Sequence, residues 1–245
     1  MNFIRKIISS HSKEDVQLYN ELKILLNFSP RKINKYKKAF THRSVQMLDK
    51  KGILINYERL EFLGDSILGS IIAAYLYKKV PEGSEGYLTQ MRSKIVSREH
   101  LNELGKDLNL IRFVKSNVDQ ANVGDNIHGN IFEALIGAIY LDKGYNACQK
   151  FIYNNVIVPY VDIEKLEGKI TSYKGLIIEW CQKQKKKYIF DSYEDSGNET
   201  IKHFSVKISI DGKQIAKGRA TSKKKAEEQA SKRVYFTFQK QIDSV

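Results

Sequence analysis

The sequence feature that most constrains the fold is the run YERLEFLGDSIL at residues 57–68, where three acids interrupt an otherwise apolar helical pattern. At about 3.6 residues per turn, Glu58, Glu61 and Asp65 fall on one stripe of the predicted helix. Apolar residues occupy the opposite side: Leu60, Leu63, Ile67, Leu68 and Ile71. Clustered carboxylates repel one another unless a cation neutralises them, and hard oxygen ligands of this kind suit Mg²⁺. For this stripe alone, a solvated acidic face is the simpler alternative.

A second helix is predicted at about residues 126–141, and its interior reads NIFEALIGAIYL. Asn130, Glu133 and Gly137 repeat the angular spacing of the first stripe, and nearly every other position is apolar. Such a helix should be buried, where a carboxylate is costly unless it is neutralised, hydrogen-bonded or bound to metal. Gly137 lowers helix stability by about 1 kcal/mol relative to alanine but lets another backbone approach closely. The two helices would then form a Mg²⁺ site from four side chains: Glu61, Asp65, Asn130 and Glu133.

Four segments of the chain resemble the ribonuclease III family in order and spacing. They are YERLEFLGDSIL, FEALIGAIYLD at 132–142, THRS at 41–44 and SEGYLTQMRSKIVS at 84–97. The resemblance implies an endonuclease that cleaves double-stranded RNA by metal-assisted phosphodiester hydrolysis and leaves 5′-phosphate and 3′-hydroxyl ends. It also implies ribosomal RNA precursors and some messenger and transfer RNA transcripts as the substrates.

The resemblance assigns roles to the clustered side chains. It implies catalytic residues Asp65 and Glu133, Mg²⁺ ligands Glu61, Asn130 and Glu133, and supporting acids Glu58 and Glu85, with Mn²⁺ as a possible substitute metal. The family normally has an aspartate where this chain has Asn130. An amide oxygen still coordinates a hard cation but adds no negative charge, so reduced metal affinity is one expected consequence. The alternative function is therefore a catalytically impaired, dimeric double-stranded-RNA-binding protein, although the retained acids argue against it.

The composition agrees with a nucleic-acid enzyme. The 245 residues, 42% of them hydrophobic, are enough to bury a core in one or two domains. A formal net charge of +13 favours a nucleic-acid partner over a small-molecule substrate. Cys148 and Cys181 lack metal-ligand spacing and are expected to be reduced. The N-terminal run MNFIRKIISSHSKED is too short and interrupted for a secretory signal or membrane anchor, which predicts a cytoplasmic protein with no membrane partner.

The chain divides into two predicted domains, which together give an α+β fold class. Helical periodicity dominates residues 17–160 and predicts an all-α endonuclease domain. A charged segment without a sustained apolar pattern, 161–171, is assigned as a linker. Residues 172–240 then read as helix, three strands and helix, with an alternating strand at 204–210 and the hairpin dipeptide Asp-Gly at 211–212.

The αβββα unit resembles a double-stranded-RNA-binding domain, which ribonuclease III enzymes of the bacterial type carry C-terminally. Lys223, Lys224 and Lys225 crowd the first turn of its last predicted helix, where the helix dipole disfavours cations unless phosphates bind there. The resemblance implies an RNA duplex read by its A-form shape, with Gln182 as a minor-groove contact. A solvated lysine run and a generic basic DNA-binding protein are the alternatives, and the αβββα order argues against both.

The loop after the first predicted strand, GNETIKHF at 197–204, lacks the Gly-Pro and histidine that the family carries there. We therefore expect its RNA contacts to be weaker or to use Asn198, Glu199 and Thr200 differently. His203 is out of register for the family's role and is expected to be a solvent-facing strand residue.

Phe62 predicts an oligomeric state. It lies beside the acidic stripe and away from the core-facing arc, where a large aromatic is unexpected unless something covers it. The resemblance implies a homodimer in which this ring enters the partner subunit, so that two acidic sites line one RNA-binding valley. Packing of Phe62 against another helix of the same chain is the alternative.

Overall fold

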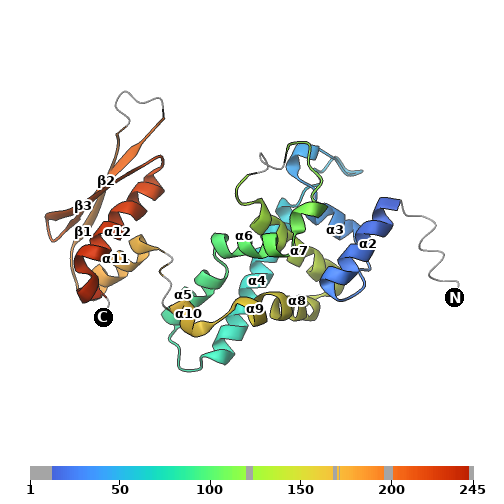
Figure 1. Cartoon of the computed structure of the whole chain (residues 1–245), viewed down its shortest axis with the longest axis horizontal. Coiled ribbons are helices and arrows are strands. Elements are labelled where there is room, and N and C mark those ends of the chain that lie inside the picture. Colours follow the sequence, from blue (N-terminus) through green and yellow to red (C-terminus); the bar gives the residue numbers. More distant parts are fainter. Residues whose placement is uncertain (1–12, 120–123, 168–169, 171, 196–200, 243–245) are drawn as a thin grey trace. The chain divides into compact units, whose positions relative to one another are not determined.

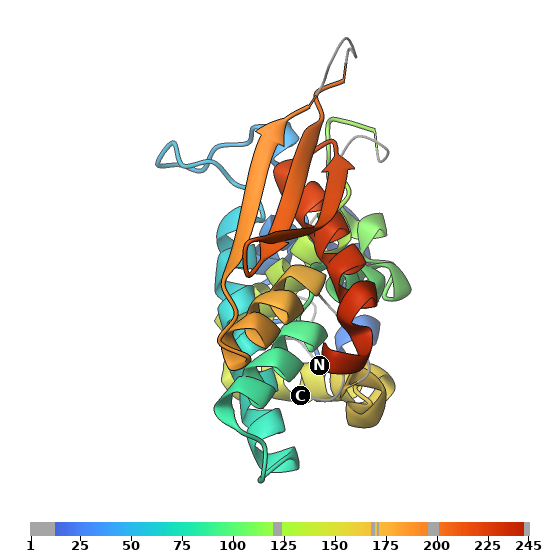
Figure 2. The same cartoon turned by 90° about the vertical axis from the view of Figure 1, so that its left-hand side faces the viewer.

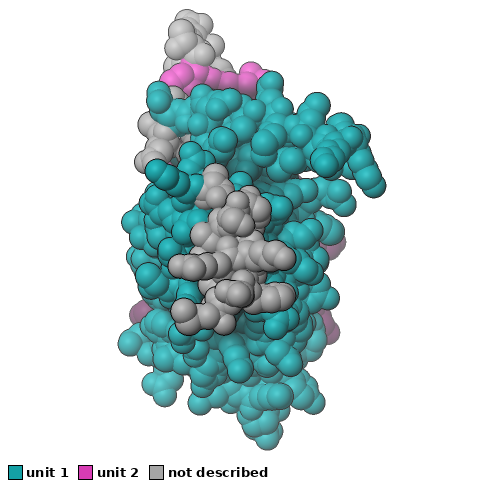
Figure 3. All heavy atoms as spheres, turned by 90° about the vertical axis from the view of Figure 1, so that its right-hand side faces the viewer, with its two compact units in different colours: residues 1–167 teal, residues 168–245 magenta. Residues whose placement is uncertain are grey.

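The computed structural model describes residues 13–119, 124–167, 170, 172–195 and 201–242. The chain folds into two compact units, Met1–Glu167 and Gly168–Val245, which are teal and magenta in Figure 3. Each unit has a hydrophobic core of its own.

Unit 1 is built from helices (Figure 1). Its α-helices are α2 (Lys13–Leu26), α3 (Ile33–Ala39), α4 (Glu58–Lys79), α5 (Glu85–Ile95), α6 (Arg98–Asp107), α7 (Ile127–Lys143), α8 (Tyr145–Ile152), α9 (Val158–Tyr160) and α10 (Ile163–Glu167). Shorter turns are the 3₁₀ segments η1 (Arg43–Val45) and η2 (Leu110–Phe113) and the π-helical segment η4 (Tyr153–Ile157).

Helix α7 forms the centre of unit 1. Helices α3, α4, α6 and α8 pack around it, so its apolar residues are buried on nearly every side. The fully buried members include Ile131, Phe132, Leu135, Ile136 and Ile139. The burial that the apolar pattern of this segment predicts is confirmed.

Helices α4 and α7 cross at two glycines. A Cβ on Gly64 would lie 1.7 Å from the carbonyl oxygen of Glu133, and a Cβ on Gly137 would lie 2.3 Å from the carbonyl oxygen of Leu60. Both distances are far inside van der Waals contact, so this crossing requires glycine on each helix. The close approach predicted from Gly137 is therefore confirmed, and it brings the N-terminal turns of the two helices together.

Serine caps fix the starts of α5 and α6. Ser84 Oγ accepts a hydrogen bond from the backbone N–H of Tyr87 at 3.3 Å, and Ser97 Oγ accepts one from that of His100 at 3.4 Å. Each serine side chain satisfies an N–H group that has no partner within the helix. The cap at Ser97 makes Arg98 the first residue of α6.

Residues 161–167, which the sequence analysis places in the linker, include α10 and pack on unit 1. Lys94 is buried in α5, and its Nζ donates to the carbonyl oxygens of Leu166 at 2.7 Å and Glu167 at 3.1 Å. The hydroxyl of Tyr87 donates to the Glu167 carboxylate. A helix of five residues is too short to show a periodic pattern, and tertiary contacts hold it in place.

Unit 2 is an antiparallel sheet packed against two helices. Strand β2 (Phe204–Ile210) lies between β1 (Tyr188–Glu194) and β3 (Lys213–Ala220), as Figure 2 shows. Helices α11 (Tyr173–Lys183) and α12 (Lys223–Ile242) complete the αβββα order. The predicted α+β fold class is confirmed.

The hairpin between β2 and β3 follows from two residues. Asp211 and Gly212 both have positive φ, at 50° and 78°, as a two-residue type I′ turn requires. This turn sets the register in which the inward-facing residues of β2 pack on α12. The core of unit 2 contains Ile177, Trp180, Val206, Ile208, Ala230 and Val234.

Within the described residues, α4 is the helix long and apolar enough to cross a membrane by length and composition alone. Core helices pass the same test, and α4 buries Leu60, Leu68 and Ile72 in the core of unit 1. Its hydropathy therefore gives only weak support for a membrane span.

Candidate active site

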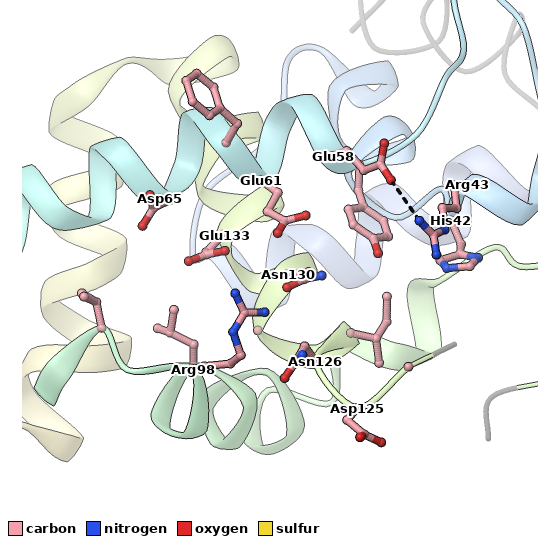
Figure 4. A pocket seen from close by; sticks show the side chains of 17 residues that line it. His42, Arg43, Glu58, Glu61, Asp65, Arg98, Asp125, Asn126, Asn130 and Glu133 are labelled. Atoms are coloured by element: carbon pink, nitrogen blue, oxygen red, sulfur yellow. Dashed lines mark ion pairs between the residues drawn. The ribbon is translucent and has the colours of Figure 1, made fainter. Parts of the chain in front are cut away.

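A cavity of about 760 Å³ lies where the N-terminal turns of α4, α6 and α7 meet (Figure 4). All four side chains of the predicted Mg²⁺ site line it: Glu61, Asp65, Asn130 and Glu133. Glu61 and Asp65 come from α4, Asn130 and Glu133 come from α7, and in Figure 4 they converge on one space. Asp65 is exposed, whereas the other three are partly buried.

Burial and neighbouring charges raise the pKa of two of these carboxyl groups. Burial, together with the charges of Asp65 and Glu61, raises the pKa of Glu133 to about 7, and the charge of Arg98 opposes this shift. Burial likewise raises the pKa of Glu61; Arg98 again opposes the shift, and Glu58 and Asp65 add to it. The ordinary pKa of a glutamate is 4.5. A cation placed among these groups would relieve both the burial penalty and the mutual repulsion.

Asn130 has two amide orientations with different consequences. In one, its Oδ1 faces two other acceptors, Glu61 Oε1 and the carbonyl oxygen of Asn126. In the other, its Nδ2 donates to those atoms at 3.3 Å and 3.2 Å. The first orientation becomes favourable when a cation lies between the oxygens, and the second satisfies the amide without one.

The donor set fits a hard divalent cation. Carboxylate and amide oxygens are the ligands that Mg²⁺ takes, and Mg²⁺ keeps several waters and so needs few protein ligands. In the described part of the chain, no three His, Cys, Asp or Glu side chains form a metal-binding group by themselves. A Mg²⁺ site here would therefore use the Asn130 oxygen together with Glu61 and Glu133.

Arg98 is a cavity residue that the sequence analysis did not identify. It is exposed at the first position of α6, and its guanidinium points toward Glu133 and Asn130 in Figure 4. Arg98 could have been predicted as a functional residue because it is a cation in the first turn of a helix, directly after a serine cap. The same signal drew attention to the lysines of α12.

Glu58 lies at the other end of the cavity, beside His42 and Arg43. Its carboxylate is 3.9 Å from Arg43 Nη1 and accepts a hydrogen bond from Asn56 Nδ2 at 3.0 Å. This ion pair is largely exposed, so it contributes little stability. The cavity thus has arginines near both of its ends.

Glu85 does not line this cavity. It is the exposed first residue of α5, and its carboxylate accepts a hydrogen bond from Thr89 Oγ1 at 3.0 Å. The geometry of a single chain therefore does not account for a supporting role of Glu85, and that role stays a prediction.

Phe62 borders the cavity and is 77% exposed. No packing of its ring against another helix is seen among the described residues. The surface around the acidic stripe therefore includes a large uncovered aromatic, as the sequence predicts.

The residues predicted to bind RNA in unit 2 are exposed. Lys223, Lys224 and Lys225 form the first turn of α12, and Ser222 Oγ accepts a hydrogen bond from the N–H of Lys225 at 3.3 Å. Gln182 is exposed in the last turn of α11. Asn198, Glu199 and Thr200 lie outside the described residues. His203 precedes β2, is partly buried and has its Nδ1 2.8 Å from the carbonyl oxygen of Ile201.

Comparison with known proteins agrees with both units. Residues 33–160 match the Ribonuclease-III-like family model, and residues 173–235 match the double-stranded RNA binding motif. The chain is 63% identical over 243 residues to Ribonuclease 3 of Zunongwangia profunda, a match covering 99% of this chain and 100% of that protein. It is 62% identical over 244 residues to Ribonuclease 3 of Flavobacterium psychrophilum, a match covering 99% of each.

A solved structure is similar to unit 1. The nuclease domain of ribonuclease III from Campylobacter jejuni superposes with a TM-score of 0.50 at 29% identity, covering 57% of this chain and 96% of that one. That structure is described as showing flexibility in a region involved in dimer formation.

Proposed function

The chain belongs to the ribonuclease III family, and from that premise we propose that its cavity hydrolyses double-stranded RNA with Mg²⁺, leaving 5′-phosphate and 3′-hydroxyl ends. It is an endoribonuclease of the ribonuclease III type, and its C-terminal unit is a double-stranded-RNA-binding domain. The observation that carries the proposal is the convergence of four side chains on one cavity: Glu61, Asp65, Asn130 and Glu133.

Each of these side chains has a proposed task. Glu61, Asn130 and Glu133 hold Mg²⁺, for which Mn²⁺ is a possible substitute, and Asp65 at the exposed side of the cavity orients the attacking water. The bound cation would lower the pKa of a water and stabilise negative charge on the phosphate and leaving oxygen. Glu58 and Glu85 keep their proposed supporting roles.

Unit 2 is proposed to supply affinity without chemistry. Lys223, Lys224 and Lys225 are exposed and can meet phosphates at the start of α12, and Gln182 is exposed and can enter a minor groove. The domain boundaries proposed from the sequence are 17–160 for the endonuclease domain, 161–171 for the linker and 172–240 for the RNA-binding domain. The proposed physiological substrates are ribosomal RNA precursors and some messenger and transfer RNA transcripts, processed in the cytoplasm.

A homodimer is the proposed assembly. Exposure of Phe62 beside the cavity supports it, because an uncovered aromatic of this size is a typical interface anchor. Dimer formation by the Campylobacter jejuni nuclease domain supports it further. Two chains joined in this way would place two acidic cavities along one duplex.

The decisive experiment separates cutting from binding. Purified full-length protein is incubated with a long RNA duplex with and without Mg²⁺, beside the variants Glu133→Ala and Asp65→Ala. Both variants should lose cleavage while they retain duplex binding, because most of the residues proposed to bind RNA lie in unit 2 and not in the cavity. Comparable cutting by either variant would show that these acids are not the catalytic site.

The same assay tests the alternative function. If the wild-type chain binds the duplex but does not cut it with either Mg²⁺ or Mn²⁺, then the protein is the catalytically impaired RNA-binding dimer, and Asn130 is the first residue to restore to aspartate.

A further inference from the structure

Arg98 occupies a position that its own helix disfavours. Helix α6 begins at Arg98, directly after the Ser97 cap. A cation in the first helical turn meets the positive end of the helix dipole, whereas an acid such as the neighbouring Glu99 is favoured there. The stability of α6 therefore does not explain an arginine at this position.

The guanidinium faces the cavity but is not bound by its acids. Figure 4 shows it extending from α6 toward Glu133 and Asn130. Within the part of the chain that the structure describes, its side chain is in no ion pair or hydrogen bond, and its charge acts on Glu61 and Glu133 only at longer range. Its N–H donors are therefore available to a ligand that enters the cavity.

The charges of the cavity indicate which ligand fits. Glu61, Glu133 and the Asn130 oxygen would hold a cation in this cavity, and the planar guanidinium of Arg98 points toward the same space. Asn130 carries no charge, so it does not hold the guanidinium in an ion pair as an aspartate would. A phosphodiester matches both groups, because its oxygens accept paired hydrogen bonds from arginine and also bind Mg²⁺.

We propose that Arg98 is a catalytic residue whose guanidinium binds a non-bridging oxygen of the scissile phosphate in double-stranded RNA. The inference rests on the proposed function of the same cavity. A cationic donor that meets negative charge as it develops during the reaction stabilises the transition state. The opposing effect of Arg98 on the pKa of Glu133 places its charge within electrostatic reach of the acids.

The reaction in which Arg98 would take part is hydrolysis of the phosphodiester bond by water. The oxygen of a water forms a bond to phosphorus, the bond from phosphorus to the 3′ oxygen breaks, and the 3′ oxygen leaves as a hydroxyl after it gains a proton. The remaining proton of the water is released to solvent. Arg98 stays protonated throughout and neutralises charge on the phosphate.

Single-turnover cleavage tests the assignment. Full-length enzyme in excess over a uniform RNA duplex is assayed at saturating Mg²⁺, so that neither metal affinity nor RNA affinity limits the rate. Arg98→Ala should cut at least about 100-fold more slowly, and Arg98→Lys should lose less because it keeps the charge. Lys106→Ala removes another exposed cation from the same helix and should cut at the wild-type rate.

Metal binding supplies a readout that does not depend on activity. Mn²⁺ binding to the free protein is followed by electron paramagnetic resonance. Arg98→Ala should bind Mn²⁺ as tightly as the wild type or several-fold more tightly, because it removes a positive charge from beside the ligands. If Arg98 merely held the acids in place, Arg98→Ala would bind Mn²⁺ more weakly than the wild type. Loss of Mn²⁺ binding would therefore overturn the proposal.

The remaining outcomes are also decisive. Arg98→Ala cutting within about threefold of the wild-type rate would overturn the role of Arg98 and leave the proposed function intact. If Arg98→Ala does not fold, Arg98→Gln takes its place, with circular dichroism as the check. If the wild-type chain does not cut duplex RNA at all, then the proposed function fails, and this inference fails with it.

Discussion

Glu133 is a partly buried carboxylate that the fold places beside two other carboxylates. Its backbone lies at the contact with Gly64, and its side chain projects into a cavity that also contains Glu61 and Asp65. Burial and these two charges raise its pKa to about 7. In the metal-free protein Glu133 therefore keeps its proton to a higher pH than an ordinary glutamate, and metal binding must displace that proton.

The raised pKa predicts a pH dependence of stability without metal. In the unfolded chain Glu133 has the ordinary glutamate pKa of 4.5, whereas in the folded chain its pKa is about 7. Between these values the folded state binds more protons, so the free energy of unfolding falls as pH rises. Glu133→Gln should therefore become progressively more stable than the wild type from about pH 5 to pH 8, as measured by urea unfolding in EDTA.

Glu82→Gln is the control for this effect, since Glu82 is an exposed carboxylate outside the cavity. Its stability should run parallel to the wild type across the same range. A constant difference between Glu133→Gln and the wild type at every pH would contradict the raised pKa.

Asn130 predicts a gain of metal affinity on mutation. Asn130→Asp adds a negative charge beside the carboxylates of Glu61 and Glu133 and exchanges an amide for a stronger ligand. Mn²⁺ should then bind roughly tenfold more tightly, since one further charge near a divalent ion contributes about 1.4 kcal/mol even in a screened site. The measurement is a Mn²⁺ titration of both proteins at pH 8; equal affinities would mean that residue 130 is not a ligand.

At the scale of helices, the site depends on the glycine contact between α4 and α7. The acids of α4 meet Asn130 and Glu133 of α7 because the two backbones approach there without side chains between them. Helix propensity alone would favour alanine over glycine at such positions by about 1 kcal/mol. Tertiary packing therefore outweighs local preference at this crossing.

Gly64→Ala should destabilise unit 1 by roughly 2 kcal/mol or more, because the new Cβ would lie 1.7 Å from the carbonyl oxygen of Glu133 and force the helices apart. Gly69→Ala is the matched control on the same helix. A Cβ there meets nothing within 4 Å, so this variant should be neutral or slightly more stable. Thermal unfolding compares the two, and equal melting temperatures would refute the tight crossing.

At the scale of the whole molecule, RNA affinity and RNA chemistry belong to different units. A truncation after Glu167 keeps α10, whose contacts with Lys94 and Tyr87 belong to unit 1. Removing unit 2 should weaken duplex binding strongly and reduce the log-log salt slope by about 0.9 for each phosphate that the protein no longer neutralises. Slow cutting at low salt should persist. An unchanged slope in a salt titration would show that unit 2 does not supply the main RNA-binding contacts.

The dimer is tested through Phe62. Phe62→Asp should raise the dissociation constant of the dimer at least about 30-fold, since a central interface aromatic contributes roughly 2 kcal/mol or more and the new charge would be buried. Helical content should be retained, because the ring is 77% exposed within the chain. Sedimentation velocity across a concentration series measures the shift.

Tyr77→Asp is the control for Phe62, because Tyr77 is 73% exposed near the C-terminal end of the same helix. It should leave the oligomeric state unchanged. If Phe62→Asp instead unfolds the chain at every concentration, the ring supports its own domain and not an interface.

The helices and strands, and the side chains that carry the chemistry, could be predicted from the sequence. Periodicity, turn residues and caps act within a few residues, so the helix of Glu61 and Asp65, the helix of Glu133 and the hairpin at Asp211 could all be predicted locally. The convergence of the two helices was also foreseeable, because a buried carboxylate requires a partner and Gly137 allows close contact.

The other residues that line the cavity, and the strength of the interactions among its charged groups, depend on the three-dimensional packing of the helices. Arg98 reaches the acids from a third helix, and Glu85 starts a helix that does not line the cavity. The pKa of Glu133 near 7 and the packing of α10 on α5 likewise depend on neighbours distant in sequence. Burial, charge proximity and short packed helices arise from contacts between remote segments, and no local pattern encodes the distances on which these contacts depend.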